Sequence, residues 1–248
     1  MIALVALAGV AALCWWWLIA SAQLMHMPAG DAATMAGMAG TAPQLPLIRY
    51  FGAAYLMWTL MMVAMMVPSA LPMVLHYARF STQSTDRNAL PNILIFAGSY
   101  LLVWVVFAGL AALAQTALVR AGSVGRMALV VGSDKFAAFL LIVTALYELS
   151  PIKRACLGQC RSAQAFLSQR WRPGIAGAIR LGFAHGIYCL GCCWLLMLLL
   201  FVGGVMNLLW VALLTLVVVA EKAAPPRLVP EKWVAGLIVL GALALLIL

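Results

Sequence analysis

The residues best suited to chemistry are one histidine and three cysteines with helical spacing. They are His185, Cys189, Cys192 and Cys193. All four lie in one apolar run, from about residue 174 to 202, which is long enough to cross a bilayer as a helix. At about 100° per residue, His185, Cys189 and Cys192 fall within about 60° of one another around the helix, and Cys193 lies next to Cys189. Ionisable groups are costly in hydrocarbon, so this helix face indicates function, either soft-metal binding or thiol chemistry.

Methionine is concentrated in a second apolar run, at about residues 50–76. Its most closely spaced members are Met61, Met62, Met65 and Met66. Pro68 and Pro72 follow, and because proline lacks an N–H we expect a kink and free carbonyls around Ala64 and Pro68. Methionine packs well in any apolar core, which is the alternative explanation. Thioethers also bind Cu(I), so we predict that these sulfurs form a soft-metal site together with the histidine and cysteines.

Further soft ligands lie outside these two runs. A loop at 23–47 is rich in Met and His, the second run ends with another Met and His, and two cysteines are spaced one helical turn apart near residue 158. For each group, packing or an unstructured loop is the competing explanation. The secondary metal candidates are Met25, His26, Met27, Met73, His76, Cys156 and Cys160.

Composition fixes the class of protein that must position these groups. The chain has 248 residues, of which 67% are hydrophobic and 8% charged. Long continuous apolar runs predict an all-α polytopic transmembrane bundle, because helices satisfy their own backbone polar groups in lipid. The net charge of +9 is concentrated in short connections between the runs, which is typical of membrane topology and not of nucleic-acid binding.

Seven apolar runs predict about seven membrane spans in a single membrane domain, 1–248. Trp15 and its two neighbours are expected at a membrane interface. The distribution of Lys and Arg, counting Lys153 and Lys222 as inside, predicts an internal N-terminus and a cytoplasmic, Cys-containing amphipathic helix in the interface at 151–172. Ser150 and Pro151 have the pattern of a helix start. The predicted spans are 2–22, 50–76, 92–119, 128–149, 175–202, 205–220 and 233–248.

Three motifs resemble a bacterial family of predicted metal-binding integral membrane proteins of unknown function. The motifs are residues 61–69, 147–161 and 182–197. The resemblance runs from about the second predicted span to the sixth. It implies a bacterial inner (cytoplasmic) membrane protein with a metal site at the cysteines and methionines, and it does not name the metal.

The ligand types favour copper(I) over other metals. Thiolates and thioethers select Cu(I), hard ions need carboxylates, and the chain has six acidic residues. Zinc is less well suited, because a tetrahedral site needs four good ligands at one depth. The hypothesis is therefore a copper-binding membrane protein in metal transport, delivery or assembly, whose partners are the lipid bilayer, the metal ion and a copper chaperone or membrane enzyme complex. No group specifies a reaction, which disfavours an enzyme.

Two alternatives remain open at the level of sequence. One is a membrane thiol oxidoreductase, although neighbouring cysteines on one helix are poorly placed to form a disulfide. The other is a non-catalytic subunit of a larger membrane enzyme complex, in which Gly182 and Gly186 provide close helix contacts.

Overall fold

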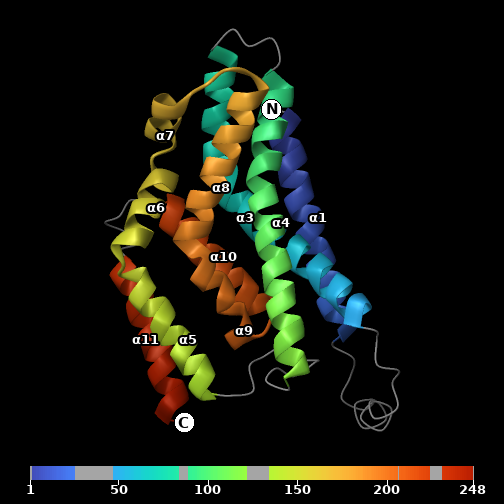
Figure 1. Cartoon of the computed structure of the whole chain (residues 1–248), viewed down its shortest axis with the longest axis vertical. Coiled ribbons are helices and arrows are strands. Elements are labelled where there is room, and N and C mark those ends of the chain that lie inside the picture. Colours follow the sequence, from blue (N-terminus) through green and yellow to red (C-terminus); the bar gives the residue numbers. More distant parts are fainter. Residues whose placement is uncertain are drawn as a thin grey trace.

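The computed structural model describes residues 2–25, 47–83, 89–121, 134–205, 207–223 and 231–247. Every regular element in these ranges is an α-helix, which confirms the predicted all-α class. Figure 1 shows an elongated bundle in which α5 and α11 form a pair at one side. The helices are α1 (Ile2–Met25), α3 (Leu47–Gln83), α4 (Ala89–Arg120), α5 (Asp134–Glu148), α6 (Pro151–Arg161), α7 (Ala163–Arg170), α8 (Gly174–Leu198), α9 (Leu200–Gly203), α10 (Leu208–Ala223) and α11 (Glu231–Ile247).

Three helical stretches are long and apolar enough to cross a membrane. They are Leu47–Thr82, Ala89–Arg120 and Gly174–Gly203. A fourth crossing is formed if α5 and α6 count as one broken span, since they meet at a bend of 63°. The three long helices match the second, third and fifth predicted spans. The α5–α6 pair falls on the fourth predicted span and the start of the connection that follows it. The described part of the chain thus supports three or four spans, where the sequence predicted about seven.

The structure has a helix start at Pro151, as the sequence predicted, but the predicted helix at 151–172 is divided at Ser162 into α6 and α7. The Ser150 side chain accepts a hydrogen bond from the Lys153 backbone N–H, and Pro151 is the first residue of α6. Gly174, at the start of α8, has φ +80°, and Gly204, after α9, has φ +91°. Only glycine adopts such angles without strain, so these two residues fix the ends of the segment that carries the cysteines.

Helix α3 continues through Pro68 and Pro72. Pro68 cannot donate a hydrogen bond to the carbonyl of Ala64, as the sequence predicted. The indole N–H of Trp15 on α1 donates to this carbonyl at 3.0 Å. Trp15, which was expected at the interface, therefore has a structural role against the methionine-rich helix.

Helices α4 and α8 pack closely through the two glycines that the sequence singled out. A Cβ atom at Gly182 would overlap the carbonyl oxygen of Phe96 and lie 2.8 Å from Cβ of Ser99. A Cβ atom at Gly186 would lie 2.7 Å from Cγ2 of Val103. Small residues at this spacing let the backbones approach, so α4 fixes the position of the helix that carries His185 and three cysteines.

We expect Gly182→Ala to destabilise the fold by about 1–3 kcal/mol, because the added methyl group meets backbone atoms of α4 that cannot move aside. Gly98→Ala on α4 is the matched control, since nothing lies within 4 Å of its Cβ position. Thermal unfolding in detergent compares the two variants. Equal melting temperatures would contradict the close packing of α4 on α8.

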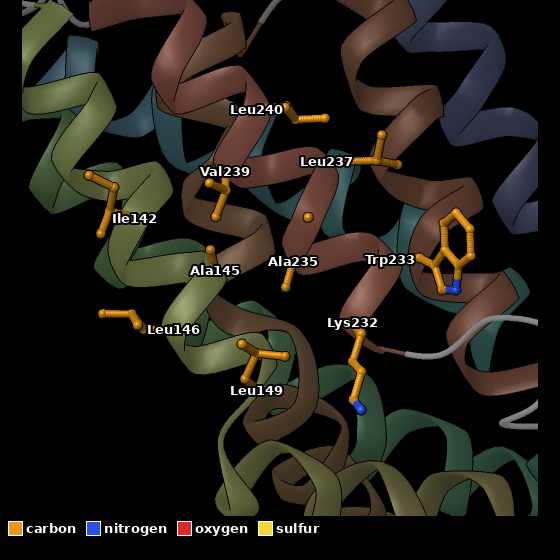
Figure 2. A pocket seen from close by; sticks show the side chains of 11 residues that line it. Ile142, Ala145, Leu146, Leu149, Lys232, Trp233, Ala235, Leu237, Val239 and Leu240 are labelled. Carbon is orange, nitrogen blue, oxygen red and sulfur yellow. The ribbon is translucent and has the colours of Figure 1, made fainter.

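The α5–α11 pair carries apolar side chains but no candidate ligands. A cavity of about 780 Å³ lies along it and is lined by aliphatic side chains and Trp233 (Figure 2). Lys232 at its edge is its one charged residue. This surface suits an apolar environment and offers no soft ligand, so the chemistry lies elsewhere in the bundle.

Candidate metal site

Four cysteines from two helices lie together. Successive turns of α8 place Cys189, Cys192 and Cys193 on the buried side of the helix, with each at most 1% exposed. Helix α6 packs along α8 and brings Cys160 into contact with the thiol of Cys192. The sequence assigned Cys160 to a separate site at another depth. The structure instead adds this thiol to the α8 cluster.

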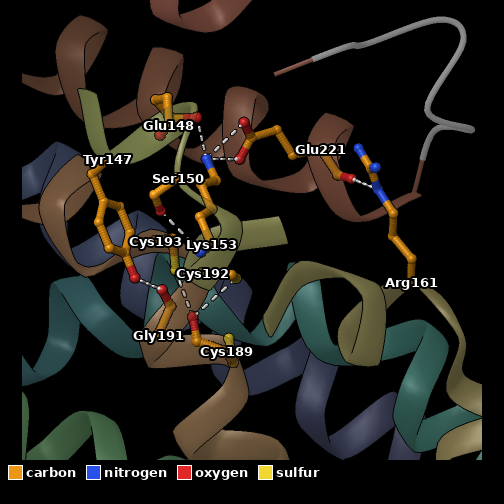
Figure 3. A network of polar contacts seen from close by, with 10 residues as sticks. All are labelled: Tyr147, Glu148, Ser150, Lys153, Arg161, Cys189, Gly191, Cys192, Cys193 and Glu221. Carbon is orange, nitrogen blue, oxygen red and sulfur yellow. Dashed lines mark hydrogen bonds and ion pairs between the residues drawn. The ribbon is translucent and has the colours of Figure 1, made fainter. Parts of the chain in front are cut away.

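Gly191 makes this close approach of α6 possible. The Cys156 sulfur packs on Gly191, where a Cβ atom would lie 2.8 Å from it. The Tyr147 hydroxyl at the end of α5 donates a hydrogen bond to the Gly191 carbonyl (Figure 3). A side chain at Gly191 would push α6 away, so this glycine sets the distance between the two cysteine-bearing helices.

The sulfur of Cys189 has two polar neighbours from other helices. The Lys222 ammonium on α10 donates to it at 2.8 Å, and the Tyr100 hydroxyl on α4 lies 3.1 Å away. Lys222 also donates to the Ser69 hydroxyl of α3 at 3.0 Å. Helices α4, α8 and α10 therefore meet at one sulfur atom, and Ser69 of α3 holds the positive charge of Lys222 beside it.

The methionine-rich helix borders the same place. Met61, Met62, Met65 and Met66 are fully buried in the core cluster that also holds the α8 cysteines. Met66 is linked most directly, because Tyr100 donates to its carbonyl at 3.3 Å and the Ser69 hydroxyl lies 3.9 Å from its sulfur. The Tyr100 hydroxyl thus links the Met66 backbone to Cys189, and all four methionines share a core cluster with the α8 cysteines.

His185 lies one turn before Cys189 in an aromatic enclosure. Its ring centroid is 5.1 Å from that of Tyr100, 6.0 Å from that of Phe166 and 6.2 Å from that of Phe96. The residue is 3% exposed, and neither ring nitrogen has a hydrogen-bond partner among the described residues. A buried imidazole is seldom left unpaired, and in its neutral form one nitrogen is free to bind a metal ion or accept a hydrogen bond while the other is free to donate its N–H.

Comparison with known protein families identifies the family of this chain. Residues 55–245 match the model of the PpoB2 family, described as copper chaperone. The chain belongs to this copper chaperone family. The matched region includes five of the six cysteines and the methionine run of α3. No curated protein and no solved structure shows significant similarity to the chain.

The remaining candidate ligands on α3 are Met73 and His76. Met73 is buried in a second core cluster with Tyr77 and Phe96, and His76, three residues further along α3, is half-buried. Three candidates of the Met/His loop cannot be compared, since His26, Met27 and the side chain of Met25 lie outside the described residues.

A buried ion group that the sequence did not reveal lies beside the thiols. Lys153 is 0% exposed and pairs with Glu148 of α5 and, at 2.8 Å, with Glu221 of α10 (Figure 3). Arg161 donates to the Glu221 backbone carbonyl. These contacts tie α6 to α5 and α10, and they hold Cys156 and Cys160 against α8. Lys153, counted as a loop charge from sequence, is an interior residue.

The sulfurs of this copper chaperone family member are neighbours without forming a closed ligand cage. The thiols of Cys192 and Cys193 donate to the Cys189 carbonyl at 3.1 and 3.0 Å. In the part of the chain that the structure describes, no three His, Cys, Asp or Glu side chains are arranged to hold one metal ion. Capture of an ion would therefore require these thiols to turn from the carbonyl.

Proposed function

We propose that this protein binds Cu(I) within a bacterial inner membrane and passes it on in copper transport, delivery or enzyme assembly. The observation that carries this proposal is the meeting of Cys160 from α6 with the α8 cysteines, in the core cluster that also holds Met66 of α3. Membership of a copper chaperone family supports copper as the cargo.

The donor types fit Cu(I) better than zinc or a hard divalent ion. Thiolates and thioethers are soft ligands, and the carboxylates nearest the thiols, Glu148 and Glu221, are occupied by Lys153. We assign the thiols of Cys160, Cys189 and Cys192 as the principal ligands, with Cys193, Met66 and His185 as supporting ligands. The unpaired nitrogens of His185 support its inclusion.

The proposed membrane arrangement keeps the predicted seven spans and internal N-terminus. Long apolar α3, α4 and α8 support a multi-pass protein. The α5–α6 pair is either the fourth span followed by an interfacial helix or one broken span, and in both cases α6 lies against α8 beside the cysteines.

The test is copper binding by the purified protein in detergent. Wild type is expected to bind Cu(I), and Cys189→Ala/Cys192→Ala/Cys193→Ala is expected to lose it. Cys14→Ala is the matched control, because Cys14 is also buried but lies on α1, outside the family match. Wild-type stoichiometry in the triple variant would overturn the site.

A second candidate, a membrane thiol oxidoreductase, is favoured by one observation. Cys160 and Cys192 come from different helices and are in contact, which removes the geometric objection to a bridge within one helix. Burial of Cys192 disfavours it, since thiol exchange needs access. Thiol labelling with and without reductant separates the two functions, and labelling that does not change with reductant would exclude the oxidoreductase.

Lys222 gives the proposed site a preference for monovalent ions. An ammonium repels a divalent ion twice as strongly as Cu(I) at the same place, while its attraction to the thiolates is unchanged. We expect Lys222→Gln to raise the affinity for Zn²⁺ relative to Cu(I) by about tenfold. Lys222→Arg, which keeps the charge, is the control. Competition between the two metals measures the ratio, and an unchanged ratio would contradict this role.

A further inference from the structure

Three arginines surround a cavity at the end of the bundle where α8 begins. The cavity has a volume of about 310 Å³ and lies between the end of α7 and the first turns of α8. Arg170 comes from the last residue of α7, Arg172 from the connection, and Arg180 from the second turn of α8. This volume is at the small end of the range for ligand sites and suits a compact group.

Arg170 is held in position by neutral partners. Its two terminal nitrogens donate to the Gln159 side-chain oxygen at 2.8 Å and to the Tyr188 hydroxyl at 3.3 Å. Its guanidinium also lies 4.9 Å from the ring centroid of Phe166 and 5.5 Å from that of Tyr188. These contacts fix the side chain but leave its positive charge uncompensated.

None of the three guanidinium groups is paired with a carboxylate in the described part of the chain. Both ion pairs found there are formed by Lys153. Three like charges around one cavity raise its positive potential and attract an anion. The planar fork of arginine matches phosphate oxygens, which it binds with paired hydrogen bonds.

The surroundings of the cavity are those of a membrane interface. Arg180 is exposed on a helix long enough to span a membrane, and the neighbouring Ile175 and Ile179 are exposed apolar residues. Trp171 lines the cavity as well. Tryptophan and arginine together at the start of an apolar helix are typical of the headgroup region of a bilayer.

We propose that this cavity binds a phosphate group, supplied by an anionic phospholipid headgroup or by a soluble phosphate compound. The phosphate oxygens would face Arg170, Arg172 and Arg180. This site is separate from the sulfur cluster, and it does not depend on the proposed copper function.

The test uses the full chain in detergent and in nanodiscs. One arm measures stabilisation and lipid retention with phosphatidylcholine alone or with added phosphatidylglycerol, and the other adds inorganic phosphate. Arg172→Gln/Arg180→Gln removes two exposed charges without disturbing Arg170, and the matched control is Arg154→Gln/Lys232→Gln, two exposed charges outside the cavity. At the usual contribution of a basic residue near an anionic lipid surface, we expect about 30-fold weaker binding in the first variant.

The two arms identify the source of the phosphate. Binding of phosphatidylglycerol that is lost in Arg172→Gln/Arg180→Gln and kept in the control supports a lipid site. Stabilisation by inorganic phosphate with the same dependence on the variants, and without lipid retention, supports a soluble ligand. The proposal is overturned if neither probe binds, or if both double variants lose binding equally, since that result shows only general charge attraction.

Discussion

Replacement of Lys153 by methionine is expected to destabilise the protein by about 3–5 kcal/mol, because it leaves two carboxylates buried without their cation. Glu148 and Glu221 are each 1% exposed, so water cannot take the place of the ammonium. The variant should melt far below wild type, and α6 should keep only the bond from Arg161 to the Glu221 carbonyl as its polar link to α10. Thermal unfolding in detergent measures the loss.

Two controls give this prediction its specificity. Lys232→Met removes an exposed lysine and should leave the melting temperature nearly unchanged. Glu148→Gln/Lys153→Met/Glu221→Gln removes all three charges and should recover much of the stability, since neutral groups cost less to bury than unpaired carboxylates. If Lys153→Met and Lys232→Met melt together, Lys153 is not the buried link that the structure shows.

Replacement of Cys160 by alanine is expected to weaken Cu(I) binding by about 100-fold or more, since the loss of a ligand exceeds the 10–100-fold effect of changes around a metal site. This result would show that α6 contributes to the copper site, which the triple substitution on α8 cannot reveal. Competition with a Cu(I) chelator of known affinity measures the change.

Cys156→Ala is the matched control, because Cys156 is half-buried on the same helix and packs on the Gly191 backbone. We expect it to lower the affinity much less. Helix content and melting temperature are measured for both variants, so that a loss of binding is not confused with a loss of fold. Equal affinities for the two variants would remove α6 from the copper site.

The apolar sequence pattern was sufficient to predict the helices but not their interior charges. Runs of hydrophobic residues predicted α3, α4 and α8, and Ser150 with Pro151 predicted the start of α6, because these signals are local. Lys153 was counted among loop charges. Its second carboxylate, Glu221, lies 68 residues further along the chain, and no local pattern indicates that contact.

The candidate site could also be predicted only where its residues are close together in the sequence. The spacing of Cys189, Cys192 and Cys193 predicted that they share one face of a helix, because residues three and four apart lie on the same side. The approach of Cys160 depends on Gly191 and on the Tyr147 contact to its carbonyl. A glycine in an apolar run does not reveal which helix packs on it, so the sequence placed the α6 cysteines in a separate site.

The bond from Trp15 to the Ala64 carbonyl bears on what constitutes the smallest complete folding unit. The family match begins at residue 55, but the Ala64 carbonyl inside the match is satisfied by the side chain of Trp15, which precedes the match. A chain shortened to the matched region would lack Trp15, and the Ala64 carbonyl of its methionine-rich helix would have no hydrogen bond from that side chain. The region that matches the family is therefore smaller than the unit that folds, and α1 belongs to the folding unit.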